Sequence, residues 1–101
     1  MAFKHLSVAD LKVMLAEQAP VLLDIRDEAS FAAGHIDGSE PLNDQSVQAL
    51  IQKTEKTAAV VVICYHGHSS QNAADFLFDQ GFSEVYSLAG GYTAWAAATT
   101  D

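Results

Sequence analysis

Short apolar runs alternate along the chain with segments in which apolar residues recur at helical spacing. The runs at 21–25, 58–64 and 85–88 are rich in aliphatic residues, and the run at 58–64 has no polar alternation. A strand with this pattern is buried on both faces, as in the centre of a parallel sheet. Because segments with helical spacing separate the runs, the pattern predicts an α/β domain with a mainly parallel sheet.

Residues that favour helix ends mark where the predicted helices begin and end. Ser7 and Asp27 are suited to cap the first turn of a helix. Gly34 and Gly81 stand where a glycine commonly follows a helix. The segment 36–42 is expected to be irregular, with at most a short strand, because it contains glycine and proline. Helices are expected over 8–19, 28–33, 45–53, 70–80 and from 91 onward.

The length and composition indicate one globular domain that spans residues 1–101. Half of the residues are hydrophobic and 18% are charged, which favours a packed core over disorder. Thirteen acidic residues outnumber five basic ones, so the formal net charge is −8, and the basic residues are scattered. Nucleic acids and anionic membrane surfaces bind clustered lysine and arginine, so neither is expected as a partner.

The chain has one cysteine, Cys64, so it forms no internal disulfide, and this usage is typical of a reducing compartment. Residues 1–6 carry no signature of a signal peptide. The longest apolar run, 58–64, is much shorter than the roughly 20 residues that cross a bilayer. A cytoplasmic protein without a membrane span is therefore expected.

Cys64 stands at the end of the strongest predicted strand, and a short loop with Gly67 separates it from the helix predicted over 70–80. Ligands of open α/β sheets bind beyond the carboxyl ends of strands. A loop that wraps around this point directs N–H groups inward, and the positive end of the next helix adds to them. Such donors lower the pKa of a thiol, whereas apolar burial raises it. The pattern favours a cysteine nucleophile, and the alternative is a cysteine that only packs in the core.

Four segments carry a resemblance to a known family, and they occur in the family's order along the whole chain. The segments 23–27, 34–36, 64–70 and 90–95 together resemble the rhodanese domain. The loop sequence Cys-Tyr-His-Gly-His-Ser-Ser is similar to that of single-domain bacterial thiosulfate sulfurtransferases of the GlpE type. This resemblance implies a single rhodanese-like domain with a parallel sheet of about five strands flanked by helices.

The resemblance also implies a thiosulfate sulfurtransferase that works by double displacement. Cys64 would attack the outer sulfur of thiosulfate, release sulfite and carry the sulfur as a persulfide. Cyanide or a dithiol protein such as thioredoxin would then accept the sulfur. No metal or organic cofactor is implied, and a monomer or weak dimer is expected. Backbone amides of the loop would hold the persulfide, so the expected substrate-binding residues are Tyr65, His66, Gly67, His68, Ser69 and Ser70.

The loop departs from many rhodaneses, which carry arginine or lysine there, because it has His66 and His68 instead. Anion binding is then expected to depend on N–H groups, the helix dipole and partly charged imidazole. The two histidines either donate to a bound anion or only shape the entrance. Together with Cys64 they do not have a usual zinc-ligand spacing. The segment 38–41 replaces a small apolar segment of the family, so a local difference is expected there.

Other polar residues have both a functional and a structural interpretation. Ser69 and Ser70 are able to hydrogen-bond the sulfur, and Ser70 is equally suited to cap the following helix. Tyr65 is expected either to wall the pocket or to pack. Arg26 is expected to pair with a carboxylate or with loop carbonyls. Structural roles are also expected for Asp24, Asp27, His35, Tyr92 and Trp95.

Several other functions share parts of this pattern. A cysteine phosphatase needs an arginine six residues after the cysteine, where this chain has Ser70. A thiol oxidoreductase would need a partner's thiol, because the chain has no resolving cysteine. A persulfide relay fed by a desulfurase is an alternative that the sequence leaves open. So is a non-catalytic rhodanese-like binding module, although such modules commonly lack the cysteine.

Overall fold

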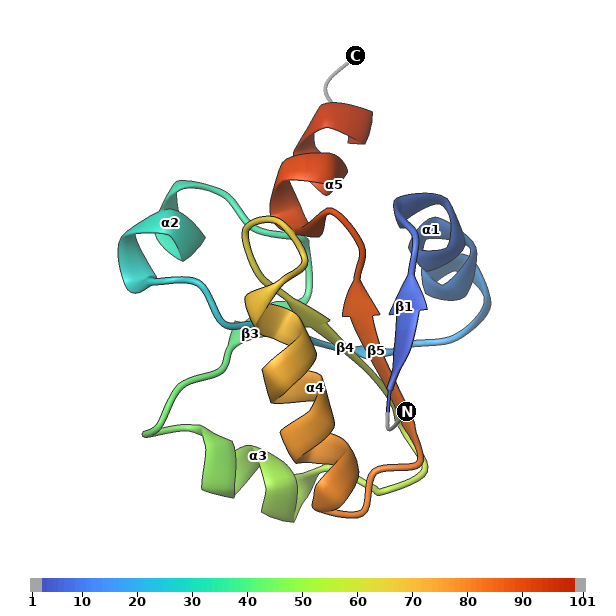
Figure 1. Ribbon diagram of the computed structural model, residues 1–101, viewed down its shortest axis with the longest axis vertical. Coiled ribbons are helices and arrows are strands. Elements are labelled where there is room, and N and C mark those ends of the chain that lie inside the picture. Colours follow the sequence, from blue (N-terminus) through green and yellow to red (C-terminus); the bar gives the residue numbers. More distant parts are fainter. Residues whose placement is uncertain (1–2, 100–101) are drawn as a thin grey trace.

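The computed structural model describes residues 3–99 as a parallel sheet with helices on both faces (Figure 1). The five strands lie in the order β1-β5-β4-β2-β3. Their bounds are β1 Lys4–Leu6, β2 Val21–Asp24, β3 Ser39–Pro41, β4 Ala59–Ile63 and β5 Glu84–Leu88. The helices are α1 Val8–Glu17, α2 Glu28–Ala33, α3 Val47–Lys53, α4 Ser69–Asp79 and α5 Gly91–Thr99. The predicted α/β fold with a parallel sheet of five strands is confirmed.

β4 is the central strand, and all its residues are buried. Its side chains alternate between two apolar clusters. Val60 and Val62 pack with residues of α3 and α4, whereas Val61 and Ile63 pack with residues of α1 and α5. Burial of one such side chain stabilises a fold by about 1.5–3 kcal/mol. The run has no polar alternation because helices cover both of its faces.

Two predicted helix starts are confirmed by their caps. The Ser7 Oγ accepts the N–H of Asp10 at 3.0 Å, and the Asp27 carboxylate accepts the N–H of Ser30 at 3.1 Å. These bonds satisfy N–H groups that have no partner within the helix. The other boundaries of the predicted helices and strands agree with the structure to within two residues.

The helix predicted over 45–53 begins two residues later than expected, at Val47. The side-chain oxygen of Asn43 accepts the N–H groups of Gln45 at 2.9 Å and of Ser46 at 3.0 Å. This arrangement holds the chain in a turn, which competes locally with the helix. The helical spacing of apolar residues did not reveal that competition.

The two glycines predicted to end helices do so for different reasons. Gly81 has φ +107°, a conformation that glycine adopts at little cost, as predicted for a residue that follows a helix. Gly34 directly follows α2, as predicted, but its φ of 173° is extended backbone that any residue adopts. A Cβ at Gly34 would lie 2.8 Å from the hydroxyl oxygen of Tyr92. Glycine at position 34 therefore allows the approach of α5.

Two short edge strands complete the sheet. β3 lies within the segment 36–42, which agrees with the expectation of at most a short strand. β1 was not predicted, because its three residues, Lys-His-Leu, have no strand pattern of their own. Parallel pairing with β5 makes this segment a strand. Within residues 3–99, no helix is long and apolar enough to cross a membrane.

Candidate active site

Cys64 directly follows β4, at the carboxyl end of the central strand. A loop of four residues, 65–68, then leads into α4. The Cys64 side chain is buried, with 3% of its surface exposed, and its thiol is free. The first turn of α4 follows the loop directly, so the positive end of that helix dipole lies close to the sulfur. The cysteine thus has the position that the sequence predicted for a ligand-binding residue of an α/β sheet.

Neutral hydrogen-bonding groups surround the Cys64 sulfur. The Gly67 N–H donates to the Sγ at 3.1 Å, and the Ser70 Oγ lies 3.2 Å from the Sγ. The Ser70 Oγ also lies 2.7 Å from the Oγ of Ser87, which comes from β5. Ser70 and Ser87 are both buried, so these hydroxyls are shielded from water.

The protonation of Cys64 reflects two opposing effects. Burial raises the pKa of the thiol, because a thiolate is poorly solvated inside the protein. Hydrogen bonds from the Ser70 hydroxyl and from the backbone N–H groups of Ser70, Gly67 and His66 lower it. Together the hydrogen bonds outweigh burial, so the pKa of Cys64 lies below its ordinary value of 9.0. The site therefore favours the nucleophilic thiolate.

The conformation of the loop depends on Gly67. This residue has φ +89°, and a Cβ on it would lie 2.8 Å from the Gly90 nitrogen and 3.0 Å from the Leu88 oxygen. Both the dihedral angle and the crowding favour glycine. The Gln71 side-chain amide donates to the Gly67 oxygen at 2.8 Å, and the Gly67 N–H donates to the sulfur, so both polar backbone groups of Gly67 are hydrogen-bonded.

The beginning of α5 holds the other side of the loop. The Tyr92 N–H donates to the Cys64 carbonyl at 2.7 Å, and the Thr93 N–H donates to the Tyr65 carbonyl at 3.1 Å. A Cβ on Gly91 would lie 2.4 Å from the Cys64 oxygen, so the approach requires glycine. The carbonyls of Cys64 and Tyr65 therefore accept hydrogen bonds from α5. The N–H groups of the loop face the sulfur. The sequence analysis did not predict that α5 holds the loop. The sequence feature that indicates this contact is the glycine pair 90–91.

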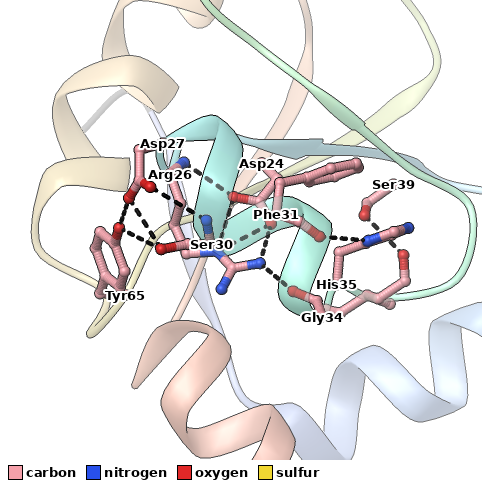
Figure 2. A network of polar contacts seen from close by, with 10 residues as sticks. Asp24, Arg26, Asp27, Ser30, Phe31, Gly34, His35, Ser39 and Tyr65 are labelled. Atoms are coloured by element: carbon pink, nitrogen blue, oxygen red, sulfur yellow. Dashed lines mark hydrogen bonds and ion pairs between the residues drawn. The ribbon is translucent and has the colours of Figure 1, made fainter.

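Tyr65 connects the cysteine loop with α2, as Figure 2 shows. Its hydroxyl donates to the Asp27 carboxylate and lies 2.8 Å from the Ser30 Oγ. The side chain is 44% exposed, so it lies at the surface rather than in the core. The side-chain hydrogen bond with Ser30 lowers the pKa of Asp27. The tyrosine ring is thus fixed beside the loop that contains Cys64.

Arg26 has the structural role that the sequence predicted. It forms a bidentate ion pair with Asp24, with 2.8 Å between Nη2 and Oδ2, and donates to the Gly34 carbonyl at 2.7 Å (Figure 2). Its guanidinium carbon lies 4.1 Å from the centre of the Tyr92 ring. The side chains of Arg26 and Asp24 are 4% and 0% exposed. The charges of Arg26 and Asp24 therefore compensate each other inside the protein.

His35 and Trp95 also have contacts that fit the predicted structural roles. The Nδ1 of His35 lies 2.8 Å from the Phe31 carbonyl oxygen, and the two rings are stacked with centroids 3.9 Å apart. Trp95 is partly buried against the cluster that contains Val61 and Ile63. These contacts keep both side chains in the framework of the fold.

The remaining residues of the predicted substrate-binding set, apart from Ser70, lie at the surface. His66, His68 and Ser69 are exposed. Within residues 3–99, the only side chain that hydrogen-bonds the sulfur is that of Ser70. The prediction that Ser70 caps α4 was wrong, because His68 is at the cap position and Ser70 lies inside the helix. The same residues 3–99 contain no group of three His, Cys, Asp or Glu side chains arranged to hold a metal ion.

The fold and the site together define a small α/β domain with a cysteine cradled by backbone donors after the central strand. The sequence model of the Rhodanese-like domain matches residues 7–98. The chain therefore belongs to the rhodanese family.

Curated relatives of similar length carry the name thiosulfate sulfurtransferase GlpE. The relative from Pseudoalteromonas translucida is 46% identical over 101 residues, which are 100% of this chain and 96% of that protein. The relative from Shewanella oneidensis is 49% identical over 94 residues, which are 93% of each chain. A third, from Pseudomonas fluorescens strain Pf0-1, is 53% identical over 81 residues, or 80% of this chain and 74% of that protein.

Solved structures of rhodanese-like domains have the same fold. The crystal structure of a rhodanese-related protein from Thermoplasma volcanium matches with a TM-score of 0.81 and 25% identity, covering 98% of this chain and 96% of that one. The solution structure of a rhodanese-like domain from Anabaena matches with a TM-score of 0.83 and 28% identity, covering 94% and 74%. These matches confirm the predicted fold class.

Proposed function

We propose that the protein is a thiosulfate sulfurtransferase that works through a persulfide on Cys64. The Cys64 thiolate attacks the outer sulfur of thiosulfate, and a new S–S bond forms. The old S–S bond of thiosulfate breaks, and sulfite leaves with its electron pair. An acceptor nucleophile then attacks the outer sulfur of the persulfide, and the Cys64 thiolate is regenerated.

The observation that carries this proposal is the set of donors around the Cys64 sulfur. The Gly67 N–H at 3.1 Å and the Ser70 hydroxyl at 3.2 Å favour a sulfur that bears negative charge. A persulfide is also an anion, so the same donors suit the intermediate as well as the free thiolate. Relatives of nearly the same length are named thiosulfate sulfurtransferase, which agrees with this chemistry.

The loop residues have different roles in the proposed reaction. The N–H groups of His66, Gly67 and Ser70 stabilise the anionic sulfur, and the Ser70 hydroxyl adds a further hydrogen bond. The exposed residues contact thiosulfate as it enters. Because the net charge of the protein is −8, this contact depends on local donors and on the imidazoles rather than on the overall field. The exposed residues are Tyr65, His66 and His68 of the loop and Ser69 at the start of α4.

The acceptor in this proposal is cyanide or a thiol, such as that of a thioredoxin-like protein. A thiol acceptor suits a reducing compartment, so we place the reaction in the cytoplasm. The reaction requires no metal or organic cofactor, since both steps exchange sulfur between nucleophiles. The proposal includes a domain over residues 1–101 that acts as a monomer or weak dimer.

Other functions of a cysteine loop fit the site less well. A cysteine phosphatase uses a guanidinium six residues after the cysteine to bind phosphate. That position is Ser70, whose hydroxyl faces the sulfur within the protein. A non-catalytic module gains nothing from donors that stabilise a thiolate. A desulfurase-fed relay would use the same persulfide, so it differs only in the donor of the sulfur.

The test is the intact mass of the protein after incubation with thiosulfate, with Cys64→Ser as the control. The expected result is the addition of one sulfur atom, which cyanide removes as thiocyanate and which the control does not acquire. The folded state of the control is checked by its circular dichroism spectrum. A parallel incubation with a cysteine desulfurase and cysteine compares the two donors. Loading by the desulfurase alone would overturn thiosulfate as the donor, and loading by neither would favour a binding module.

A further inference from the structure

Ser87 is a buried polar residue in a strand that is otherwise mostly apolar. It lies in β5 beside Val62 of the central strand and His5 of β1, and its side chain is 0% exposed. A buried hydroxyl reduces stability unless it is hydrogen-bonded. The sequence analysis assigned no role to this residue, and the proposed reaction does not use it directly.

The hydroxyl of Ser87 has one partner, and that partner contacts the nucleophile. The Oγ atoms of Ser87 and Ser70 are 2.7 Å apart, and the Ser70 Oγ is 3.2 Å from the Cys64 Sγ. Within residues 3–99, Ser70 is the only hydrogen-bond partner of the Ser87 side chain. The three side chains thus form a short chain of two contacts that begins at Ser87 and ends at the sulfur.

The number of hydrogens that Cys64, Ser70 and Ser87 share in these two contacts depends on the protonation of Cys64. With a thiolate, two hydroxyl hydrogens serve two contacts: Ser87 donates to Ser70, and Ser70 donates to the sulfur. With a thiol, three hydrogens compete for the same two contacts, so one hydrogen has no acceptor among these three side chains. An unsatisfied buried donor is unfavourable. The geometry therefore favours the anionic form of the sulfur.

We propose that Ser87 is a positioning residue whose hydroxyl donates to Ser70 and thereby directs the hydrogen of Ser70 towards the Cys64 sulfur. The inference rests on the proposed function, because it concerns the same nucleophile. Ser87 does not touch the substrate, and its effect passes through Ser70. It provides the thiolate with a second, buried hydroxyl in place of a charged partner.

Charged groups on the surrounding elements do not account for the same effect. Burial and the hydrogen bonds from Ser70, Gly67 and His66 are the largest influences on the pKa of Cys64. The Asp24–Arg26 pair compensates its own charge. The titratable groups on the loop, on the elements packed around it and in contact with Tyr65 are Lys4, His5, Asp24, Arg26, Asp27, Tyr65, His66, His68, Asp75, Asp79, Glu84, Tyr86 and Tyr92.

The test is the pH profile of Cys64 alkylation by iodoacetamide in Ser87→Ala, Ser87→Thr and the parent protein. Loss of the hydroxyl in Ser87→Ala should raise the pKa of Cys64. At a pH below the pKa of Cys64 in the parent protein, the alkylation rate of the variant should be lower roughly three- to tenfold. Ser87→Thr keeps the hydroxyl, so its rate should return to within about twofold of the parent rate. Ser83→Ala, which changes an exposed serine just before β5, is the matched control and should leave the profile unchanged.

A double-mutant cycle with Ser70→Ala separates an effect through Ser70 from a general effect on packing. If Ser70 transmits the effect, Ser87→Ala should change the profile of the Ser70→Ala protein by less than twofold. An unchanged profile in the single variant Ser87→Ala would overturn the inference. An equal change in both backgrounds would overturn it too, and so would a Ser87→Thr protein that behaves like Ser87→Ala.

The outcome for Ser87 is independent of the outcome for the proposed function. Alkylation measures the thiolate without any sulfur donor, so it decides the role of Ser87 even if thiosulfate does not load the protein. Loading of the parent protein is measured separately by intact mass. Normal loading with an unchanged alkylation profile in Ser87→Ala would reject the positioning role and leave the proposed function intact.

Discussion

The loops that follow β2 and β4 lie side by side at the carboxyl ends of these strands, because the two strands are parallel neighbours. They use polar groups in opposite ways. The end of β2 and the loop after it contain the buried Asp24–Arg26 ion pair and the Asp27 cap, so the charges of the pair are compensated within the protein. The loop after β4 contains the free Cys64, and neutral N–H and hydroxyl groups surround its sulfur.

The comparison separates residues that build the site from residues that react. A buried guanidinium whose charge is already paired with a carboxylate attracts a substrate anion less strongly than an unpaired one would. Backbone N–H groups of a loop that wraps around the sulfur carry no compensating charge, and the Gly67 N–H donates to the Cys64 sulfur, so these groups suit a thiolate or persulfide. In the proposed reaction the charged loop is therefore the scaffold, and the neutral loop holds the reacting sulfur. The side chain of Tyr65 joins them through Asp27.

The largest effect is expected where the neutral loop crowds its own backbone. Gly67→Ala should lower the rate of sulfur loading from thiosulfate at least about tenfold, because the φ of +89° and the 2.8 Å approach to Gly90 both oppose a Cβ. The matched control is Gly38→Ala, because Gly38 has φ +87° and a Cβ there would meet no atom within 4 Å. The control should cost about 1–2 kcal/mol of stability from the dihedral angle alone and leave loading unchanged. Equal effects of the two variants on loading would contradict this account.

The next effect concerns the charged loop and should appear in stability rather than in activity. Arg26→Ala leaves Asp24 buried without its partner, which should lower the free energy of unfolding by about 3–5 kcal/mol. Urea unfolding measures this loss. Sulfur loading by the folded variant should stay within about threefold of the parent rate, because the donors to Cys64 are unchanged. A complete loss of loading in a folded protein would mean that Arg26 belongs to the reactive site.

The exposed pair of Lys53 and Glu40 provides the control for that variant. Their side chains are 58% and 49% exposed, and the two charges are 3.0 Å apart. Lys53→Ala should lower the free energy of unfolding by no more than about 1 kcal/mol, because water already solvates the remaining carboxylate. Both variants, Arg26→Ala and Lys53→Ala, remove one partner of an ion pair. The difference between their losses in free energy of unfolding therefore measures the effect of burial.

A smaller effect is expected in the pH dependence of stability. Burial raises the pKa of Cys64, but the hydrogen bonds with Ser70, Gly67 and His66 bring the net value below 9.0. The folded state therefore binds the proton less tightly than the unfolded state does. The stability that the thiolate contributes is complete above pH 9.0, the unfolded value, and is lost as the pH falls through the folded value.

The measurement is the difference in the free energy of unfolding between the parent protein and Cys64→Ser, taken over this pH window. The difference should grow in favour of the parent as the pH rises towards 9.0. The carboxylates of the scaffold loop are present in both proteins, so their titration cancels. A difference that shrinks with rising pH would mean that burial outweighs the hydrogen bonds.

The smallest effect is expected at the connection between the two loops. Tyr65→Phe removes the hydroxyl that donates to Asp27 but keeps the aromatic ring. Loading should change by less than about threefold, because the Thr93 N–H still holds the Tyr65 carbonyl at 3.1 Å. The measurement is the initial rate of persulfide formation at several thiosulfate concentrations. A change of tenfold or more would show that the two loops act together in the reaction.

The parts of the site that were predictable are those that neighbouring residues form. The uninterrupted apolar run at 58–64 predicts the central strand and places Cys64 at its end. Gly67 predicts a tight loop because few other residues adopt the backbone angle that such a loop needs. The Ser7 and Asp27 caps were predictable for the same reason, since a cap and its N–H partner are three residues apart.

The parts that were not predictable depend on contacts between distant segments. The role of Ser70 is an example, because its sequence position suits a cap equally well. Its register in α4 places the hydroxyl beside Cys64, and the pairing of β5 with β4 brings Ser87 within 2.7 Å. The Tyr92 and Thr93 N–H groups that hold the loop likewise come from the start of α5, far along the chain.

The sequence by itself determined the α/β order of elements, the central strand and the single cysteine at its end, because local spacing and chemistry encode these features. The tertiary structure decided which groups surround the sulfur and which charges are buried together. The physical reason is that burial and hydrogen bonding act between segments that only the folded sheet brings together. The sequence thus predicted the nucleophile, and the fold arranged the hydrogen-bond donors that lower the pKa of its thiol.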